Sequence, residues 1–178
     1  TTEDLADASF AGQQDSFLNI KGDARLLEYI KKCFSSLYTP RAIFYRKKKG
    51  FSGALIAVVI QKMVDSEKSG VVFSRDPVKQ DDKITIEAVF GLGEGIVSGK
   101  IHPDNYKVER DLEINDVIIS NKKIAIVRTA GGDNEIVKLS EGKSRSQVLT
   151  TGEIKEVADF AIRLEEHYKK PQDIEFAL

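Results

Sequence analysis

The sequence has little that could cross-link it or anchor it in a membrane: among 178 residues there is one cysteine, one methionine and no tryptophan. Cys33 cannot form an internal disulfide, and with His102 and His167 it cannot supply the four ligands of a structural zinc site. The longest apolar run, Ala54 to Ile60, is far shorter than the roughly 20 residues of a membrane helix. We therefore expect a cytoplasmic protein with no membrane partner.

Neither sign of charge is in excess. The 27 basic and 28 acidic residues give a net charge of −1, which argues against a nucleic-acid-binding surface. A hydrophobic content of 41% and a charged content of 31% are typical of a folded globular protein. With no repeat and no linker, we expect residues 1–178 to form one α+β domain. Because Thr1 is not a methionine and Leu178 ends a strand-like alternation, we expect this domain to be incomplete at both ends.

Three segments have the apolar spacing and caps of helices. They are a helix over 24–38 capped by Asp23, a short helix that begins at Thr39-Pro40, and a long helix opened by the capping box of Thr150 and Glu153.

Between these helices the period changes to that of strands. The β-branched run from Leu55 to Val64 predicts a strand buried on both faces, paired as a hairpin with 70–74. Alternation predicts a further strand over 84–90 that ends at the glycines, with Glu87 among its polar positions. Shorter alternations predict strands near 106–108, 117–119, 124–127 and 135–139, the last after a turn at 131–134.

The clearest candidate for chemistry is the alternation at the C-terminal end. A period of two places Asp173 and Glu175 on one face of a strand, opposite Ile174 and Phe176. Two carboxylates on one face can share a hard cation such as Mg²⁺. The alternative interpretation is that both line the solvated face of an edge strand.

Glycines 91, 93 and 95 follow the strand over 84–90, and their backbone amides could approach a phosphate closely. The segment lacks the Gly-Lys-Ser/Thr of a P-loop, so a glycine-rich turn capped by Glu94 is the alternative.

Three further features are compatible with a ligand. The small residues of segment 9–16 could cover a polyanion, or form an ordinary polar turn. Gln61 interrupts an apolar run, where its amide needs either a ligand or an intramolecular partner. Met63 suits an adenine slot as well as a core.

Together these segments resemble the nucleotide-binding domain of the phosphoenolpyruvate synthase (pyruvate, water dikinase) family, which also includes pyruvate phosphate dikinase and rifampin phosphotransferase. The resemblance rests on five blocks in family order: TTEDLADASFAGQQDSFLNI, VVIQKMV, SGVVFSRDP, IEAVFGLGEGIVSGKIHPDNY and HYKKPQDIEFAL. It implies an ATP-grasp fold, in which adenine lies between two α+β subdomains and Mg²⁺ bridges the phosphates of ATP.

The resemblance also implies roles for individual residues. Nucleotide contacts would come from Gly12, Ser16, Gln61, Met63 and Glu94, the last at the phosphates or the metal, and Asp173 with Glu175 would carry the magnesium. Ser16 stands where relatives commonly have threonine, which keeps the hydroxyl.

In this family, ATP phosphorylates a histidine on a separate domain, and a further domain passes the phosphate to pyruvate, giving phosphoenolpyruvate, AMP and phosphate. The partners implied are thus ATP and the phosphohistidine and pyruvate-binding domains. Phosphate-binding cations of the family lie outside this sequence, so we expect the isolated chain to be inactive. The alternatives are a related dikinase or antibiotic phosphotransferase and a non-catalytic nucleotide-binding module.

Overall fold

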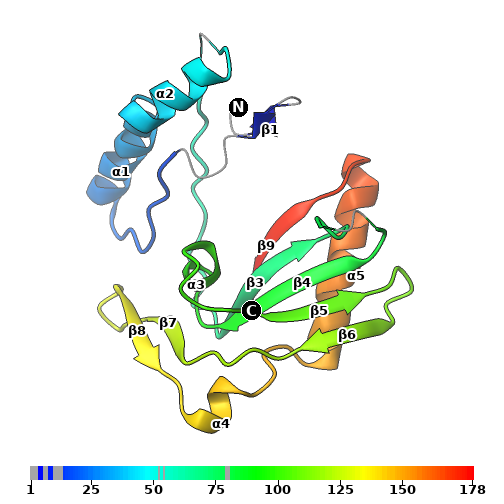
Figure 1. Ribbon diagram of the computed structural model, residues 1–178. Coiled ribbons are helices and arrows are strands. Elements are labelled where there is room, and N and C mark those ends of the chain that lie inside the picture. Colours follow the sequence, from blue (N-terminus) through cyan, green and yellow to red (C-terminus); the bar gives the residue numbers. More distant parts are fainter. Residues whose placement is uncertain (1–3, 6–7, 10–13, 52, 54, 79–80) are drawn as a thin grey trace. The chain divides into compact units, whose positions relative to one another are not determined.

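The computed structural model describes residues 4–5, 8–9, 14–51, 53, 55–78 and 81–178 (Figure 1). The chain divides into two compact units, Thr1–Met63 and Val64–Leu178, which are described separately below.

The N-terminal unit contains two short strands and two helices. Strands β1 (Asp4–Leu5) and β2 (Ala8–Ser9) pair antiparallel, and helices α1 (Asp23–Ser36) and α2 (Pro40–Lys48) follow. The predicted start of α2 is confirmed, because the Thr39 side chain accepts a hydrogen bond from Ala42 N at 3.3 Å and Pro40 begins the helix. At α1 the N-cap is Gly22, so the predicted cap by Asp23 is wrong.

The predicted strand from Leu55 to Val64 is also wrong. Among the described residues of this segment none is in a helix or strand, and the Leu55 and Val59 side chains are 81% and 83% exposed. A strand needs a neighbour to complete its hydrogen bonds, and both edges of β3 (Lys68–Phe73) are taken by β4 (Ile84–Phe90) and β9 (Asp173–Ala177). The expected hairpin partner, β3, is thus already paired on both sides. The apolar composition of the segment favours a strand, but it has no free edge of β3 to pair with.

The C-terminal unit is built on a five-stranded antiparallel sheet, in the order β6-β5-β4-β3-β9. Its other two strands are β5 (Asp104–Val108) and β6 (Ile114–Ile118). Strands β7 (Ile124–Arg128) and β8 (Asn134–Lys138) form a separate hairpin. The helices are α3 (Glu94–Val97), α4 (Glu141–Ser144) and α5 (Thr151–Tyr168). The predicted strands of this unit, the capping box and the final strand are confirmed.

Helix α5 covers one face of the sheet, as Figure 1 shows. The core consists of alternate strand residues packed against the apolar stripe of the helix, among them Ile84, Ile86, Ala88, Tyr106, Ile154, Val157 and Ala161. Because strand side chains alternate, the residues between these core positions point to the opposite face of the sheet. The candidate site lies on that opposite face.

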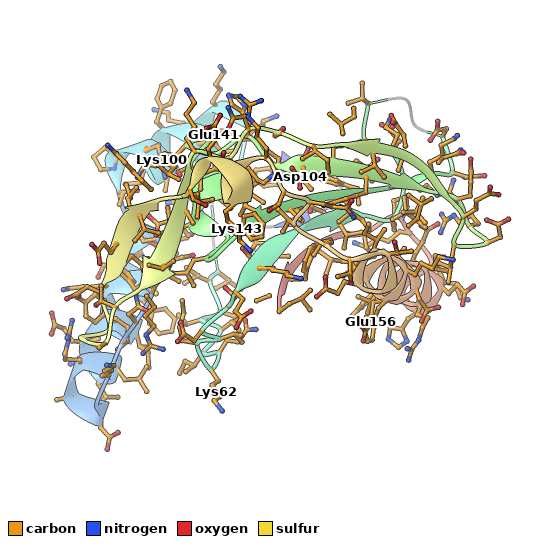
Figure 2. The ribbon with its side chains drawn as sticks, turned by 90° about the horizontal axis from the view of Figure 1, so that it is seen from below. Lys62, Lys100, Asp104, Glu141, Lys143 and Glu156 are labelled. Atoms are coloured by element: carbon orange, nitrogen blue, oxygen red, sulfur yellow. The ribbon has the colours of Figure 1, made fainter. Side chains whose placement is uncertain are left out.

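A buried ion pair holds three segments of this unit together. Lys122 and Asp104 are both fully buried, and Nζ of Lys122 donates to Oδ1 of Asp104 (labelled in Figure 2) and to the Ser120 carbonyl at 2.9 Å. Asp104 also accepts from Ser120 N and Val148 N, each at 2.9 Å, and from the Tyr106 hydroxyl at 3.1 Å. Burial raises the pKa of Tyr106 well above its ordinary value, so this hydroxyl keeps its proton and donates.

We expect Lys122→Met to lower the free energy of unfolding by about 3–5 kcal/mol, because Asp104 would stay buried without its cation. Urea denaturation at pH 7 measures this loss. The exposed neighbour Lys123 is the control, since Lys123→Met should change stability by less than about 0.5 kcal/mol. Equal effects of the two substitutions would contradict a structural role for the buried pair.

A second ion pair, between Lys68 and Glu153, makes the stability of this unit change with pH in the acidic range. The hydrogen bond from Lys68 Nζ, at 2.7 Å, lowers the pKa of Glu153 below its ordinary 4.5. A carboxylate with a depressed folded-state pKa stabilises the fold above its unfolded pKa, and this stabilisation is lost as the pH falls through the folded value.

We therefore expect Lys68→Met to be destabilising at pH 7 and nearly neutral well below pH 4.5, in denaturation curves measured from pH 7 to pH 2. Lys155→Met on the exposed side of α5 should show no such convergence with the wild type.

Candidate functional site

The two predicted metal-binding carboxylates lie side by side on the face of the sheet opposite α5. In the antiparallel register of β9 with β3, Glu175 is opposite Val71 and Asp173 is opposite Phe73. The alternate residues Ile174 and Phe176 pack against the core. Asp173 and Glu175 are therefore both exposed on one face, about 7 Å apart along the strand, as their spacing predicted.

A third carboxylate, Glu87, lies on the same face in the cross-strand row of Glu175, and sequence reasoning does not select it as a site residue. Val71 pairs with Glu175 on one side and with Glu87 of β4 on the other, so all three side chains point to the same face. Glu87 is partly buried. The alternation over 84–90 places Glu87 away from the core, but only the order of the strands shows that β3 alone separates it from β9.

The glycine turn after β4 is fixed by its backbone. Gly91 has φ = 80°, and a Cβ there would overlap the carbonyl oxygen of Ile126 in β7. Leu92 N donates to that same oxygen at 2.8 Å, and Gly91 N donates to the Glu67 carbonyl at 2.8 Å. Glycine is thus required at 91 both by conformation and by close approach.

This turn leads onto the face that carries the carboxylates. Ser69 lies in the row next to Glu175, opposite Ala177 and Val89, and its hydroxyl donates to the Gly91 carbonyl at 2.6 Å. Gly93 faces the same hydroxyl, since a Cβ there would be 3.6 Å from it. Ser69 is consequently one same-face step, about 7 Å along β3, from Val71, the residue opposite Glu175, and its hydroxyl connects this face to the turn.

Glu94, the first residue of α3, is held by the β7–β8 hairpin. Nδ2 of Asn134, at the start of β8, donates to Oε2 of Glu94 at 2.6 Å. Glu94 is a partly buried residue.

The other candidate residues belong to the N-terminal unit. Ser16 lies in an irregular segment before α1 and is exposed, Gln61 is exposed, and Met63 is partly buried. Because Gln61 faces water rather than an apolar strand, the expectation that its amide must find a protein or ligand partner is wrong. Gly12 lies outside the described residues.

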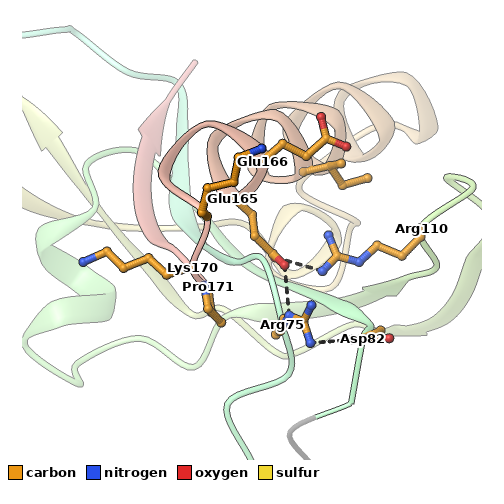
Figure 3. A pocket seen from close by; sticks show the side chains of 9 residues that line it. Arg75, Asp82, Arg110, Glu165, Glu166, Lys170 and Pro171 are labelled. Atoms are coloured by element: carbon orange, nitrogen blue, oxygen red, sulfur yellow. Dashed lines mark hydrogen bonds and ion pairs between the residues drawn. The ribbon is translucent and has the colours of Figure 1, made fainter.

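A pocket of about 570 Å³ lies elsewhere, at the C-terminal end of α5 (Figure 3). There Glu165 accepts from Arg75 Nε at 2.9 Å and from Arg110 Nη2 at 2.8 Å. Burial raises the pKa of Glu165, but hydrogen bonds from Arg110, Ser74 and Arg75 outweigh it, and the net pKa is lowered. The paired charges favour a structural role for this pocket.

Within the described part of the chain, no group of three or more His, Cys, Asp or Glu residues is arranged to hold a metal ion by itself. Asp173, Glu175 and Glu87, on the same face of the sheet, offer carboxylate oxygens, which are the ligands that hard cations prefer.

Comparison with known proteins shows what this arrangement belongs to. The family described as "Pyruvate phosphate dikinase, AMP/ATP-binding domain" matches residues 1–178. The chain is a member of this family. It is 48% identical to the probable phosphoenolpyruvate synthase of Methanocaldococcus jannaschii over 99% of its length, and 49% identical to that of Archaeoglobus fulgidus over 100%. It is 45% identical over 100% of its length to the rifampicin phosphotransferase of Bacillus cereus.

Membership of this AMP/ATP-binding domain family confirms the predicted α+β, ATP-grasp-like fold class. The chain spans only 15%, 24% and 21% of the lengths of these three relatives. Among the helices in the described residues, none combines the length and the apolar character needed to cross a membrane.

We expect Gly91→Ala to lower the free energy of unfolding by at least about 2 kcal/mol, because alanine is strained at positive φ and its Cβ would displace Ile126. Gly99 is the matched control, since it has φ = 67° and an added Cβ there would meet no atom within 4 Å. Gly99→Ala should show only the conformational cost, of about 1 kcal/mol. If denaturation gives the same loss for both variants, the close approach to β7 is not a constraint.

Proposed function

We propose that this chain binds Mg·ATP for a phosphotransferase of the phosphoenolpyruvate synthase type. The observation that carries the proposal is the row of Glu175, Val71 and Glu87, with the glycine turn beginning on the same face of the sheet. A strand face that carries carboxylates beside a glycine turn suits a polyanion bridged by a metal.

Asp173 and Glu175 would hold Mg²⁺. This ion keeps several waters and is usually bound by one or two carboxylates together with the phosphates of the substrate, so two acids on one strand are a sufficient protein contribution. When bound, the ion neutralises charge on the phosphates and orients them. Glu87, in the cross-strand row of Glu175, would accept a hydrogen bond from a water of the ion.

The remaining nucleotide contacts come from the family resemblance. Gly12 and Ser16 would contact the phosphates, Gln61 and Met63 would lie near adenine, and Glu94 would contact the nucleotide or its metal. Gln61 is exposed in the N-terminal unit, which leaves its amide accessible to a ligand.

The acceptor would be a histidine on another domain of the protein that contains this chain, and the final product phosphoenolpyruvate with AMP and phosphate. Two of the relatives above are named as probable phosphoenolpyruvate synthases, which favours pyruvate as the final acceptor. The relative named rifampicin phosphotransferase, at 45% identity, keeps an antibiotic acceptor as the second candidate.

The test is thermal melting of the protein that contains this chain, with and without Mg·ATP. At a ligand concentration about 100-fold above Kd, ATP should stabilise the wild type by about 2.7 kcal/mol. We expect Asp173→Asn and Glu175→Gln each to weaken binding at least about tenfold, which removes about 1.4 kcal/mol of that stabilisation. Removing Mg²⁺ with EDTA should have the same effect on the wild type.

Asp116→Asn is the matched control. Asp116 is an exposed carboxylate on β6, at the other edge of the same sheet, and its loss should leave the response to Mg·ATP unchanged. Identical stabilisation of all three variants would remove the magnesium assignment. A wild type that does not respond to Mg·ATP would remove the nucleotide site as a whole.

A further inference from the structure

The β7–β8 hairpin holds the glycine turn at two separate points. The first is the backbone of β7, where Ile126 accepts from Leu92 N and bridges to Gly91. The second is the side chain of Asn134, the first residue of β8, which donates to Glu94 at 2.6 Å. Forty residues separate Asn134 from Glu94 in the sequence. The contact therefore depends on the tertiary placement of the hairpin.

The hairpin is itself well braced at this point. Thr129 N donates to the Asp133 carbonyl at 2.8 Å, and Gly132 N donates to the Thr129 carbonyl at 2.9 Å. The Thr129 hydroxyl also accepts from Asp133 N at 3.2 Å. Asn134 is then paired with Arg128 in the ladder. Its backbone is thus fixed on both sides, so its amide reaches Glu94 from a rigid base.

The orientation of this hydrogen bond follows from chemistry. An ionised carboxylate only accepts hydrogen bonds, so the nitrogen of the Asn134 amide must be the atom that faces Glu94. The bond engages Oε2 and holds the carboxylate of Glu94 in one orientation. A glutamate held in one conformer before binding loses less conformational entropy when a ligand arrives.

We propose that Asn134 is a positioning residue for nucleotide binding, which acts by fixing the carboxylate of Glu94 beside the glycine turn. The proposal rests on the proposed function, since it assumes that Glu94 contacts Mg·ATP. Residues that orient a binding group through a hydrogen bond commonly contribute about 10- to 100-fold to affinity in metal sites. Asn134 is expected at the lower end of that range, because the backbone of β7 continues to hold the turn.

The test is a double-mutant cycle on Mg·ATP affinity in the protein that contains this chain, measured by calorimetry with Asn134→Ala, Glu94→Ala and the double variant. We expect Asn134→Ala to weaken binding about tenfold, with a melting temperature without nucleotide close to that of the wild type. In the Glu94→Ala background, Asn134→Ala should cause no further loss, because its effect passes through Glu94.

Asn115→Ala is the matched control, because Asn115 also donates its amide to a glutamate, Glu109, at the far edge of the sheet. Its affinity for Mg·ATP should equal that of the wild type. Should Asn134→Ala fail to fold, Asn134→Asp keeps the size of the side chain, replaces the donor with a second carboxylate, and should weaken binding at least as much.

Each result has one interpretation. Affinity of Asn134→Ala or Asn134→Asp equal to that of the wild type would overturn the proposal. So would a double variant that loses the product of the two single effects, since Asn134 would then act independently of Glu94. Absence of Mg·ATP binding by the wild type overturns the proposed function itself, and the positioning role with it.

Discussion

The register of β9 on β3 is the constraint on which the candidate site depends. Because side chains alternate along a strand, a slip of one residue would turn Asp173 and Glu175 into the core and expose Ile174 and Phe176. The cost of burying two carboxylates against α5 makes the observed register far more stable than its neighbours. The apolar core on one face thus determines where the acids lie on the other, and the site is positioned by packing rather than by contacts among its own members.

The second element of the site, the glycine turn, depends on a different part of the fold. Gly91 is positioned by Ile126 of β7, and Glu94 by Asn134 of β8, so the hairpin determines how the turn lies on the sheet. The hairpin is in turn tied to the main sheet by the buried pair of Lys122 and Asp104, since Lys122 lies two residues before β7 begins. A change at this buried pair is therefore expected to reach the turn, although neither residue is part of the candidate site.

Local signals predicted the parts of the fold whose cause is local. The capping box of α5, the turn before β8 and the alternation of β9 each contain the residues that determine them, and all three are confirmed. The run from Leu55 to Val64 has the composition of a strand, but strand formation requires an edge to pair with, and β4 and β9 occupy both edges of β3. Glu87 was missed for the same reason, since only the sheet order places it near Glu175.

The two faces of the sheet therefore serve different requirements. The face toward α5 is apolar and closely packed, and it supplies the stability that fixes the register. The opposite face carries Glu175, Glu87 and Thr85, polar groups that gain nothing from the core. The Thr85 hydroxyl is buried without a hydrogen-bond partner among the described residues, which lowers the stability of the folded protein. Val89 and Ser69 of this face are also buried, so the face is packed near the turn, while Glu175 at its β9 edge stays exposed.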